Sequence, residues 1–238
     1  MRIAVLILTA AFLAASPATA EEAGEQLKAY CFDPNPQIRM VACTVIIDGN
    51  KAQGGGLADA YSARGTAFYI LKNRARAIED FTSAIALDPT RELLYGYRGD
   101  AHLMSGEYSL AVADFDAAIA RDPKYAEALF GRASARRLMG DNDAAIADYT
   151  AVLALSPDFV EAVGYRGIVH QKKGEFDAAI TDFNRVIELN PNNAEALDLR
   201  AGAYRDKGDA AHAAEDYGAA LKLDPGDETA KRELQRLR

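Results

Sequence analysis

Five prolines of this chain lie 34 residues apart, and this spacing constrains the fold more than any other feature of the sequence. They are Pro89, Pro123, Pro157, Pro191 and Pro225. A fixed period of this size is typical of chains built from copies of one supersecondary unit. Alanines, aromatic rings and small residues follow the same step: Ala77, Ala111, Ala145, Ala179 and Ala213; Phe81, Phe115, Tyr149, Phe183 and Tyr217; Gly65, Gly99, Ala133, Gly167 and Ala201. The sequence therefore predicts an array of five repeats.

This pattern resembles the tetratricopeptide repeat family. Units of that family carry a small residue at the eighth position, alanine at the twentieth, an aromatic residue at the twenty-fourth and proline at the thirty-second. The resemblance covers 170 of the 238 residues and implies an all-α fold, in which antiparallel helix pairs stack as a solenoid with a right-handed superhelix. Counting back from each proline gives the units 58–91, 92–125, 126–159, 160–193 and 194–227.

Each unit is expected to form two helices joined by a short turn. In the fourth unit, apolar residues from Phe176 to Ile187 recur at helical spacing and predict the second helix. Glycine recurs where the first helix must end in a left-handed residue: Gly106, Gly140, Gly174 and Gly208. Residue types that cap helix N-termini precede the prolines: Asp88, Asp122, Ser156, Asn190 and Asp224. Because proline also suits a first helical position, we expect a helix to begin at each proline.

Arginine and aspartate form a further periodic set, with sixteen residues between the two in every unit. The residues are Arg64, Arg98, Arg132, Arg166 and Arg200, and Asp80, Asp114, Asp148, Asp182 and Asp216. The two positions lie side by side in an antiparallel helix pair, which predicts one internal ion pair per repeat. The alternative is an arginine ladder that binds phosphates or carboxylates. We favour the ion pair, because an arginine already matched by an aspartate is not available to an anion.

Residues 1–20 have the features of a signal peptide. Arg2 supplies a positive charge, an apolar stretch follows, and the sequence Ala-Thr-Ala over 18–20 fits the cleavage rule. The apolar stretch is too short to span a bilayer. We therefore expect a mature chain that starts at Glu21, has no membrane span and is periplasmic or secreted.

The two cysteines, Cys31 and Cys43, lie in the segment 21–57 that precedes the repeats. In an exported chain such a pair favours a disulfide, and the alternative is two buried free thiols. Apolar residues within 38–46 predict a helix that covers the first repeat, and a glycine-rich linker follows over 49–56. The segment is therefore predicted to be an N-terminal cap. A cap of this kind followed by such repeats is similar to a group of exported repeat proteins of alphaproteobacteria, most of them of unknown role.

Residues 228–238 have the length of one more helix. Leu234 and Leu237 can cover the fifth repeat while the basic residues of this segment face water. We expect a C-terminal capping helix.

The sequence carries no residue pattern for catalysis, and we expect no enzyme, no cofactor and no metal site. Phosphate-binding, dinucleotide-binding, nucleophile-elbow and zinc-protease motifs are all missing from it. His102 and His170 occupy the same position of two different repeats, which is too far apart to share a metal because packed helices lie about 8–10 Å apart. The net charge of −8 also disfavours nucleic acid as a partner.

First helices in the resembled family present a concave face whose residues contact partners. Here the positions on that face vary while the core positions do not. The candidate groove residues are Tyr69, Tyr97, Asp100, Phe130, Ser134, Arg137, Tyr165, Gln171 and Arg205, and the same face carries Glu161, Asp198 and Asp206. Aromatic anchors among polar neighbours are typical of protein-binding surfaces. We expect Phe130 to be exposed there without a role in the core. The alternative is that Tyr97 and Tyr165 lean into their helix pairs and leave Phe130 as the one available ring.

The resemblance and the missing catalytic motifs together favour a non-enzymatic binding scaffold. Its partner would be a peptide or helix of another cell-envelope protein, and the chain itself would be a monomer or associate weakly. Some family members bind chaperone C-termini through lysine at the fifth position and asparagine at the ninth. No unit of this chain has that lysine and asparagine, and the fifth unit has Asp198 and Gly202 at these positions. An alternative of a different class is a structural protein that self-associates through its end caps.

Overall fold

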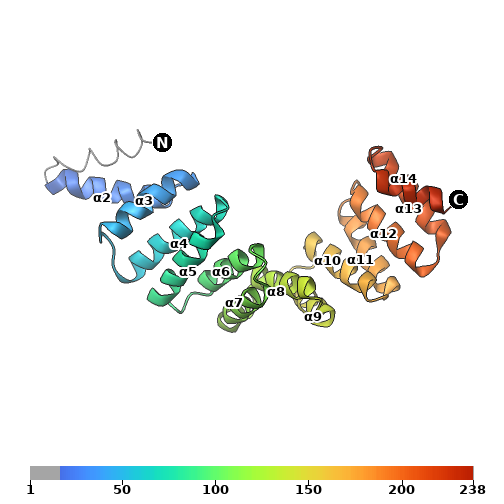
Figure 1. Cartoon of the computed structure of the whole chain (residues 1–238), viewed down its shortest axis with the longest axis horizontal. Helices are drawn as coiled ribbons and strands as arrows, with labels where there is room; N and C mark the ends of the chain where they lie inside the picture. The colour runs from blue at the N-terminus through green and yellow to red at the C-terminus, as the bar shows by residue number, and fades with distance from the viewer. Residues whose placement is uncertain (1–16, 238) are drawn as a thin grey trace. The chain divides into compact units, whose positions relative to one another are not determined.

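The computed structural model describes residues 17–237 and contains thirteen helices and no strands within that range (Figure 1). The helices are α2 (Pro17–Cys31), α3 (Pro36–Asp48), α4 (Gly54–Ile70), α5 (Arg74–Leu87), α6 (Glu92–Met104), α7 (Tyr108–Arg121), α8 (Ala126–Met139), α9 (Asn142–Leu155), α10 (Val160–Lys172), α11 (Phe176–Leu189), α12 (Ala194–Lys207), α13 (Ala210–Leu223) and α14 (Glu228–Arg236). Each repeat supplies two consecutive helices, from α4 and α5 in the first repeat to α12 and α13 in the fifth. The chain divides into two compact units, an N-terminal one that ends at Pro123 and a C-terminal one that starts at Lys124.

The turns inside the repeats have the predicted left-handed residue. Gly106, Gly140, Gly174 and Gly208 have φ angles of 79°, 85°, 81° and 91°. Lys72 occupies the equivalent position of the first repeat with a φ of 62°. Because a β-carbon disfavours this conformation, glycine is the residue that suits it best.

Helices do not begin at the prolines, so that expectation was wrong. The residues before the prolines end the second helix of each repeat, and the next helix starts three residues after the proline. In the first of these connections, Asp88 Oδ1 accepts a hydrogen bond of 3.2 Å from the amide of Thr90. Side chains that can cap a helix also close this kind of turn, and the sequence pattern alone does not separate the two roles.

The periodic alanines and aromatic rings form the interior of each repeat. The ring of Phe115 is 1% exposed, that of Tyr149 is fully buried, and the five periodic alanines expose no surface. The small residue on the facing helix is required by this packing: a β-carbon on Gly99 would lie 2.8 Å from the ring of Phe115. Such a distance leaves no room for a side chain unless the ring moves.

Neighbouring repeats complete each other's cores. Phe81 of the first repeat packs against Ala101 of the second, and Phe183 of the fourth packs against Ala203 of the fifth. A single helix pair leaves one side of its aromatic residue uncovered, so its stability depends on the next pair in the array.

The N-terminal cap contains two helices, α2 and α3, of which only the second was predicted. A disulfide joins Cys31 to Cys43, with an S–S distance of 2.07 Å, and both residues belong to a buried cluster that continues into α4. The linker is shorter than predicted, because α4 already begins at Gly54. Ile38 is 38% exposed and does not take part in the predicted apolar face. Residues 1–16 of the predicted signal peptide lie outside the described residues.

The C-terminal cap is the helix α14. Its residue Ala230 is buried, and Leu234 and Leu237 pack with it against Tyr217 of the fifth repeat. None of the helices within 17–237 combines the length and apolar character that a bilayer span requires.

Candidate functional site

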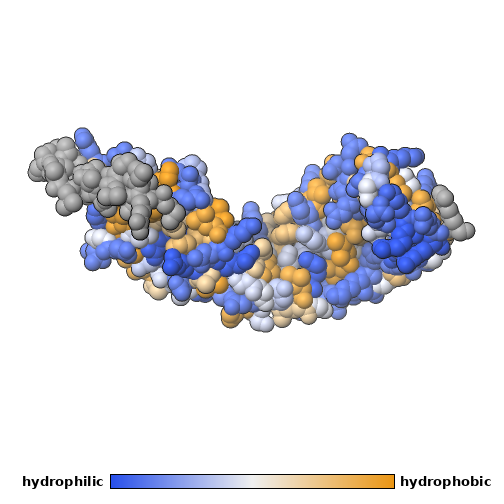
Figure 2. Space-filling model, turned by 45° about the horizontal axis from the view of Figure 1, so that its top comes forward, coloured by the Kyte–Doolittle hydropathy of each residue, from blue (hydrophilic) through white to orange (hydrophobic). Residues whose placement is uncertain are grey.

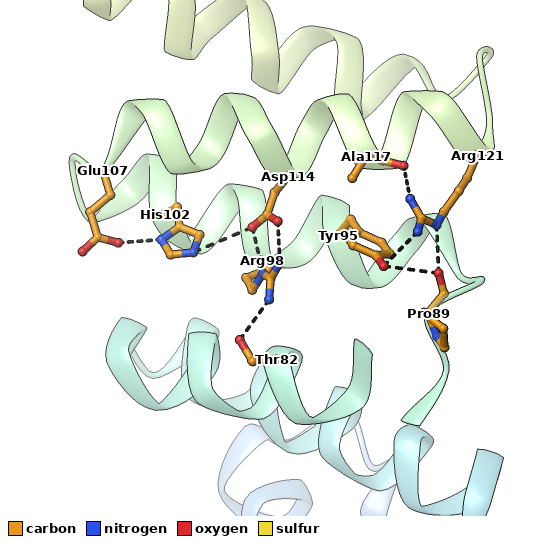
Figure 3. Close-up of polar contacts among 9 residues, drawn as sticks. All are labelled: Thr82, Pro89, Tyr95, Arg98, His102, Glu107, Asp114, Ala117 and Arg121. Atoms are coloured by element: carbon orange, nitrogen blue, oxygen red, sulfur yellow. Dashed lines mark hydrogen bonds and ion pairs between the residues drawn. The ribbon is translucent and has the colours of Figure 1, made fainter. Parts of the chain in front are cut away.

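Each periodic arginine is joined to its aspartate by two parallel hydrogen bonds. In the second repeat, Arg98 Nε lies 2.9 Å from Asp114 Oδ2 and Nη2 lies 2.7 Å from Oδ1 (Figure 3). The other four pairs have the same geometry, with N···O distances from 2.6 to 3.0 Å. These hydrogen bonds raise the pKa of Arg98 above its ordinary value, and the same holds for Arg64 and Arg200. The arginines are therefore engaged inside the repeats.

Three of these arginines also reach back to the preceding repeat, a contact that the sequence analysis missed. Arg98 Nη1 donates to Thr82 Oγ1 at 3.1 Å (Figure 3), and Arg166 Nη1 donates to Thr150 Oγ1 at 3.2 Å. In the fifth repeat, the acceptor of Arg200 Nη1 is Asn184 Oδ1 at 2.6 Å. The signal was present in the sequence, because these acceptors share one position of the 34-residue period.

A second arginine connects the first two repeats. Arg121, at the end of α7, donates to the carbonyl of Pro89 and to the hydroxyl of Tyr95, both at 2.9 Å (Figure 3). Its guanidinium lies 3.9 Å from the centre of the Tyr95 ring. This contact fixes the turn that leads from one repeat to the next.

Two of the histidines contact carboxylates five residues further along the chain. Nδ1 of His102 lies 2.5 Å from Glu107 Oε2 (Figure 3), and Nδ1 of His170 lies 2.6 Å from Glu175 Oε2. Across residues 17–237, no three histidine, cysteine, aspartate or glutamate side chains cluster as metal ligands would.

The N-terminal unit holds three of the predicted groove residues. Tyr69 is half-buried against the Phe68 and Phe81 cluster, and burial raises the pKa of its hydroxyl. Tyr97 is 36% exposed, with its ring centre 5.6 Å from that of Phe81. Burial raises the pKa of Asp100 to about 6. Of the two rings, Tyr97 is the one available to a partner.

Phe130, in the C-terminal unit, is not the exposed ring that we expected. It is half-buried, and its ring centre lies 4.9 Å from Phe159, 5.7 Å from Tyr149 and 5.9 Å from Tyr165. Phe159 was missed by the sequence analysis, because it does not belong to the periodic aromatic set. Tyr165 is 36% exposed, so the tyrosine, and not Phe130, presents the surface of this aromatic cluster.

Polar side chains hold the aromatic cluster in place. The guanidinium of Arg137 lies 4.8 Å from the centre of the Tyr165 ring, within range of a cation–π interaction. Ser134 Oγ lies 3.2 Å from the hydroxyl of Tyr149. The structure thus brings four predicted groove residues together around one buried tyrosine: Phe130, Ser134, Arg137 and Tyr165.

A cavity of about 340 Å³ lies between α10 and α12, and we call it the α10–α12 cavity. Its floor is apolar and its rim is polar. The apolar residues are Val160, Ile168, Phe183, Val186, Ala196 and Leu199, and the rim residues are Glu161, Tyr165, Asn190, Asn193 and Glu195. Gly164 also lines it, and a β-carbon there would meet its nearest neighbour, Val186 Cγ2, at the ordinary contact distance of 3.8 Å. The opening beside Gly164 therefore has room for a side chain from another molecule.

A second cavity, of about 280 Å³, lies between α12 and α14, and we call it the α12–α14 cavity. The predicted groove residues Gln171 and Arg205 line it and are joined through Asp206. Gln171 Nε2 donates to Asp206 Oδ2 at 2.7 Å, and Arg205 donates to Asp206 Oδ1 at 2.8 Å and to Glu233 Oε2 at 3.0 Å. Figure 2 shows that hydrophilic residues dominate this end of the C-terminal unit.

Asp198 is the most perturbed carboxyl group of this second cavity. Burial, together with the nearby carboxylate of Asp227, raises the pKa of Asp198 to about 7. The pKa of Asp227 is lowered, because it is hydrogen-bonded to Asp198 and also accepts the amides of Ala230 and Thr229 at the start of α14. Asp198 Oδ1 is buried and has no hydrogen-bond partner among the described residues.

Comparison with protein families assigns most of the repeat region to known models. Two models described as tetratricopeptide repeat match the chain, one over residues 98–160 and 166–228 and the other over 58–91. No curated protein matches it.

Several solved structures have a similar fold. A crystal structure of MamA protein is 23% identical, with a TM-score of 0.67 over 71% of this chain and 92% of that one. YrrB, described as a TPR protein with an unusual peptide-binding site, is 20% identical, with a TM-score of 0.70 over 82% of this chain and 98% of that one. MamA from Desulfovibrio magneticus RS-1 is 17% identical, with a TM-score of 0.70 over 74% of this chain and all of that one. At these identities the likeness concerns the fold alone.

Proposed function

Because the chain belongs to the tetratricopeptide repeat family, we propose that it is a protein-binding scaffold that holds a segment of a partner protein against its first helices. Proteins of this family are typically interaction scaffolds without enzymatic activity. The fold is all-α and built from helix pairs, as the resemblance implied. The peptide-binding site named for YrrB supports the same role here.

The observation that carries the proposal is the α10–α12 cavity. It joins an apolar floor to a polar rim, and the exposed edge of Tyr165 borders it. Binding sites for peptides and small molecules are concave, mostly apolar and equipped with a few polar groups that fix orientation. A tyrosine at the edge of such a site is a common anchor, because it combines a large apolar surface with a hydroxyl group.

We further propose that the scaffold works outside the cytoplasm, in the periplasm or after secretion. The disulfide between Cys31 and Cys43 supports this location, because disulfides persist in oxidising compartments. The predicted cleavage after Ala20 supports it as well. Determination of the N-terminus of the protein recovered from its native cell tests the proposal. Glu21 is the expected first residue, and retention of residues 1–20 would contradict it.

Photocrosslinking in the native cell tests the binding site. A photoreactive phenylalanine analogue at Tyr165 should capture a specific protein that mass spectrometry can identify. The same analogue at Thr181, an exposed residue of α11, serves as the control and should not capture that protein. Gly164→Leu should abolish the crosslink from Tyr165, since the new side chain would fill the cavity. Equal capture from both positions would show that the groove is not the binding surface.

Self-association through the end caps remains the second candidate, and the surface of α14 argues against it. The outward side chains of this helix are charged, with Glu228, Arg232 and Arg236 exposed by 82%, 60% and 67%. Stacking two such ends would remove charged groups from water with little apolar area in return. Sedimentation over a range of concentrations distinguishes the two candidates, because end-to-end association requires a mass that grows with concentration.

A further inference from the structure

The two cavities of the C-terminal unit form one continuous surface along α12. Glu195 and Leu199 line both of them. The side facing α10 is the apolar one, and the side facing α14 is polar. A bound segment that follows α12 would therefore meet an apolar site and a polar site in succession.

The charge of this surface is negative. Four acidic residues line the two cavities, namely Glu161, Glu195, Asp198 and Glu233, and one basic residue, Arg205, lines the second. The positive charge of Arg205 is already compensated inside the protein, since its guanidinium contacts Asp206 and Glu233 at 2.8 and 3.0 Å. Glu233 is likewise compensated, because Arg236 and Arg232 contact it at 2.8 and 3.8 Å. Among the described residues, the carboxyl groups of this surface that lack a matching cation are those of Glu161, Glu195 and Asp198.

The environment of Asp198 is the strongest indication that this surface favours a positively charged group of a partner. Its buried Oδ1 has no hydrogen-bond partner among the residues from 17 to 237, and the carboxylate of Asp227 lies near it. A buried acceptor that lacks a donor has an unfavourable free energy. An ammonium or guanidinium group entering the α12–α14 cavity would reduce the repulsion between the carboxyl groups of Asp198 and Asp227.

We propose that this surface binds a partner segment in which an apolar side chain occupies the α10–α12 cavity and a neighbouring lysine or arginine occupies the α12–α14 cavity. This inference rests on the proposed function and adds the chemistry of the partner. Complementary charge sets the specificity and orientation of such a segment, and an acidic segment is disfavoured by repulsion. The length of the segment between its two anchors is set by α12, where Ala196 lines the α10–α12 cavity and Asp198 lines the α12–α14 cavity.

Selection from a random library of linear peptides tests the proposal. The purified protein should select peptides in which lysine or arginine lies within a few residues of a large apolar residue. Replacing that lysine by acetyllysine in a selected peptide should weaken binding about tenfold or more, because the neutral group forms no charge-assisted hydrogen bond. Glu195→Gln and Asp198→Asn should each weaken binding of the unmodified peptide by a similar factor. Glu188→Gln, an exposed acidic residue of α11 outside both cavities, is the matched control and should bind normally.

The outcomes separate this inference from the proposed function. Peptides that lose binding in Gly164→Leu but show no enrichment in basic residues, or that tolerate acetyllysine, would overturn the basic-segment inference and leave the scaffold role intact. Selection of no peptide, or of peptides that bind Gly164→Leu as well as the unmodified protein, would overturn the groove itself. Gly218→Leu controls for the substitution, because that helical glycine lies outside both cavities and a β-carbon there has no neighbour within 4 Å.

Discussion

Gly164 and Gly167 lie one turn apart on α10, yet only the second is required by packing. A β-carbon on Gly167 would lie 2.8 Å from the Phe183 ring, whereas on Gly164 it would lie 3.8 Å from Val186. The first glycine borders the cavity and the second lets the two helices of the fourth repeat approach each other. Two glycines on one helix thus have different roles, since Gly164 leaves space in the cavity and Gly167 leaves space for the ring of Phe183.

This relationship predicts opposite effects of the same substitution. Gly164→Ala should raise the free energy of unfolding by about 1 kcal/mol, because alanine favours the helix and meets no obstacle. Gly167→Ala should lower it by about 1–3 kcal/mol, because the new methyl group overpacks the ring of Phe183. Urea denaturation of both variants measures the two changes. Stabilisation by both substitutions would show that the helices can separate without cost.

The ion pair of Arg98 and Asp114 should be strongly coupled. Each single change to alanine is expected to lower the free energy of unfolding by about 3 kcal/mol, since it leaves a charge inside the repeat without its partner. The double variant should lose less than the sum, with a coupling of about 1–3 kcal/mol. The second repeat suits this test better than the third, because Asp148 accepts a hydrogen bond of 2.7 Å from Arg136, whereas the additional contact of Asp114, with His102 Nε2, is 3.7 Å long. The exposed pair of Arg185 and Asp158 is the control and should show a coupling below about 1 kcal/mol.

Phe130→Ala should destabilise the C-terminal unit by about 2 kcal/mol or more, because the ring contacts three other aromatic rings. The sequence analysis implied a nearly neutral change, so this experiment also tests the correction. Thermal and urea unfolding give the value. Tyr97→Ala, with a more exposed ring in the N-terminal unit, should have a smaller effect. A loss below about 0.5 kcal/mol for Phe130→Ala would restore the exposed ring as first expected.

Asp198 should make the stability of the C-terminal unit depend on pH. Because its pKa is raised from 3.8 to about 7 in the folded protein, the folded state holds a proton that the unfolded chain releases. The free energy of unfolding should therefore fall as the pH rises from about 4 to about 7. Asp198→Asn should remove this dependence and be more stable than the unmodified protein by about 1 kcal/mol at pH 8, a value reduced because the group is incompletely buried. Asp158→Asn, exposed on the same unit, should leave the pH profile unchanged.

The disulfide should stabilise the N-terminal cap more than the distant repeats. Closing the loop between Cys31 and Cys43 contributes about 3 kcal/mol in the chain-entropy model. In Cys31→Ser, hydrogen exchange should accelerate in α2, α3 and α4, while α12 and α13 keep their protection because each repeat contacts only its neighbours. Uniform acceleration along the whole chain would instead indicate that the cap controls global unfolding.

The periodic features of this structure were predictable from the sequence, whereas several features that occur once, such as the helix α2, were not. The helix pairs, the buried rings and the left-handed glycines follow from the 34-residue step, because identical positions must meet the same packing in every unit. The role of the pre-proline residues was misassigned, since aspartate at position 88 suits a cap and a turn equally well. The helix α2 was missed because it has no counterpart in the repeats.

The candidate groove was predicted less well than the core. Several of the predicted positions lie together in the structure, but their exposure depends on neighbours that vary from unit to unit. Phe130 is covered because Phe159, at the end of its own repeat, stacks on it. The perturbed state of Asp198 depends on Asp227, which caps the last helix and lies 29 residues further along the chain. Such pairings come from the fold and leave no periodic trace in the sequence.

The resemblance to exported alphaproteobacterial proteins stays a prediction.

The contact between Arg64 and Thr44 has a consequence for how such a chain can change in length. Arg64 Nη1 donates to Thr44 Oγ1 of α3 at 3.3 Å, as Arg98 of the second repeat does to Thr82 of the first. The helix α3 thus gives the first repeat the acceptor that later repeats receive from a preceding unit. Gene duplication could therefore insert one more 34-residue unit, and its arginine would find an acceptor on the unit before it. Loss of the segment before the array, in contrast, would deprive the first unit of that acceptor, so the array can lengthen by whole units more readily than it can lose its beginning.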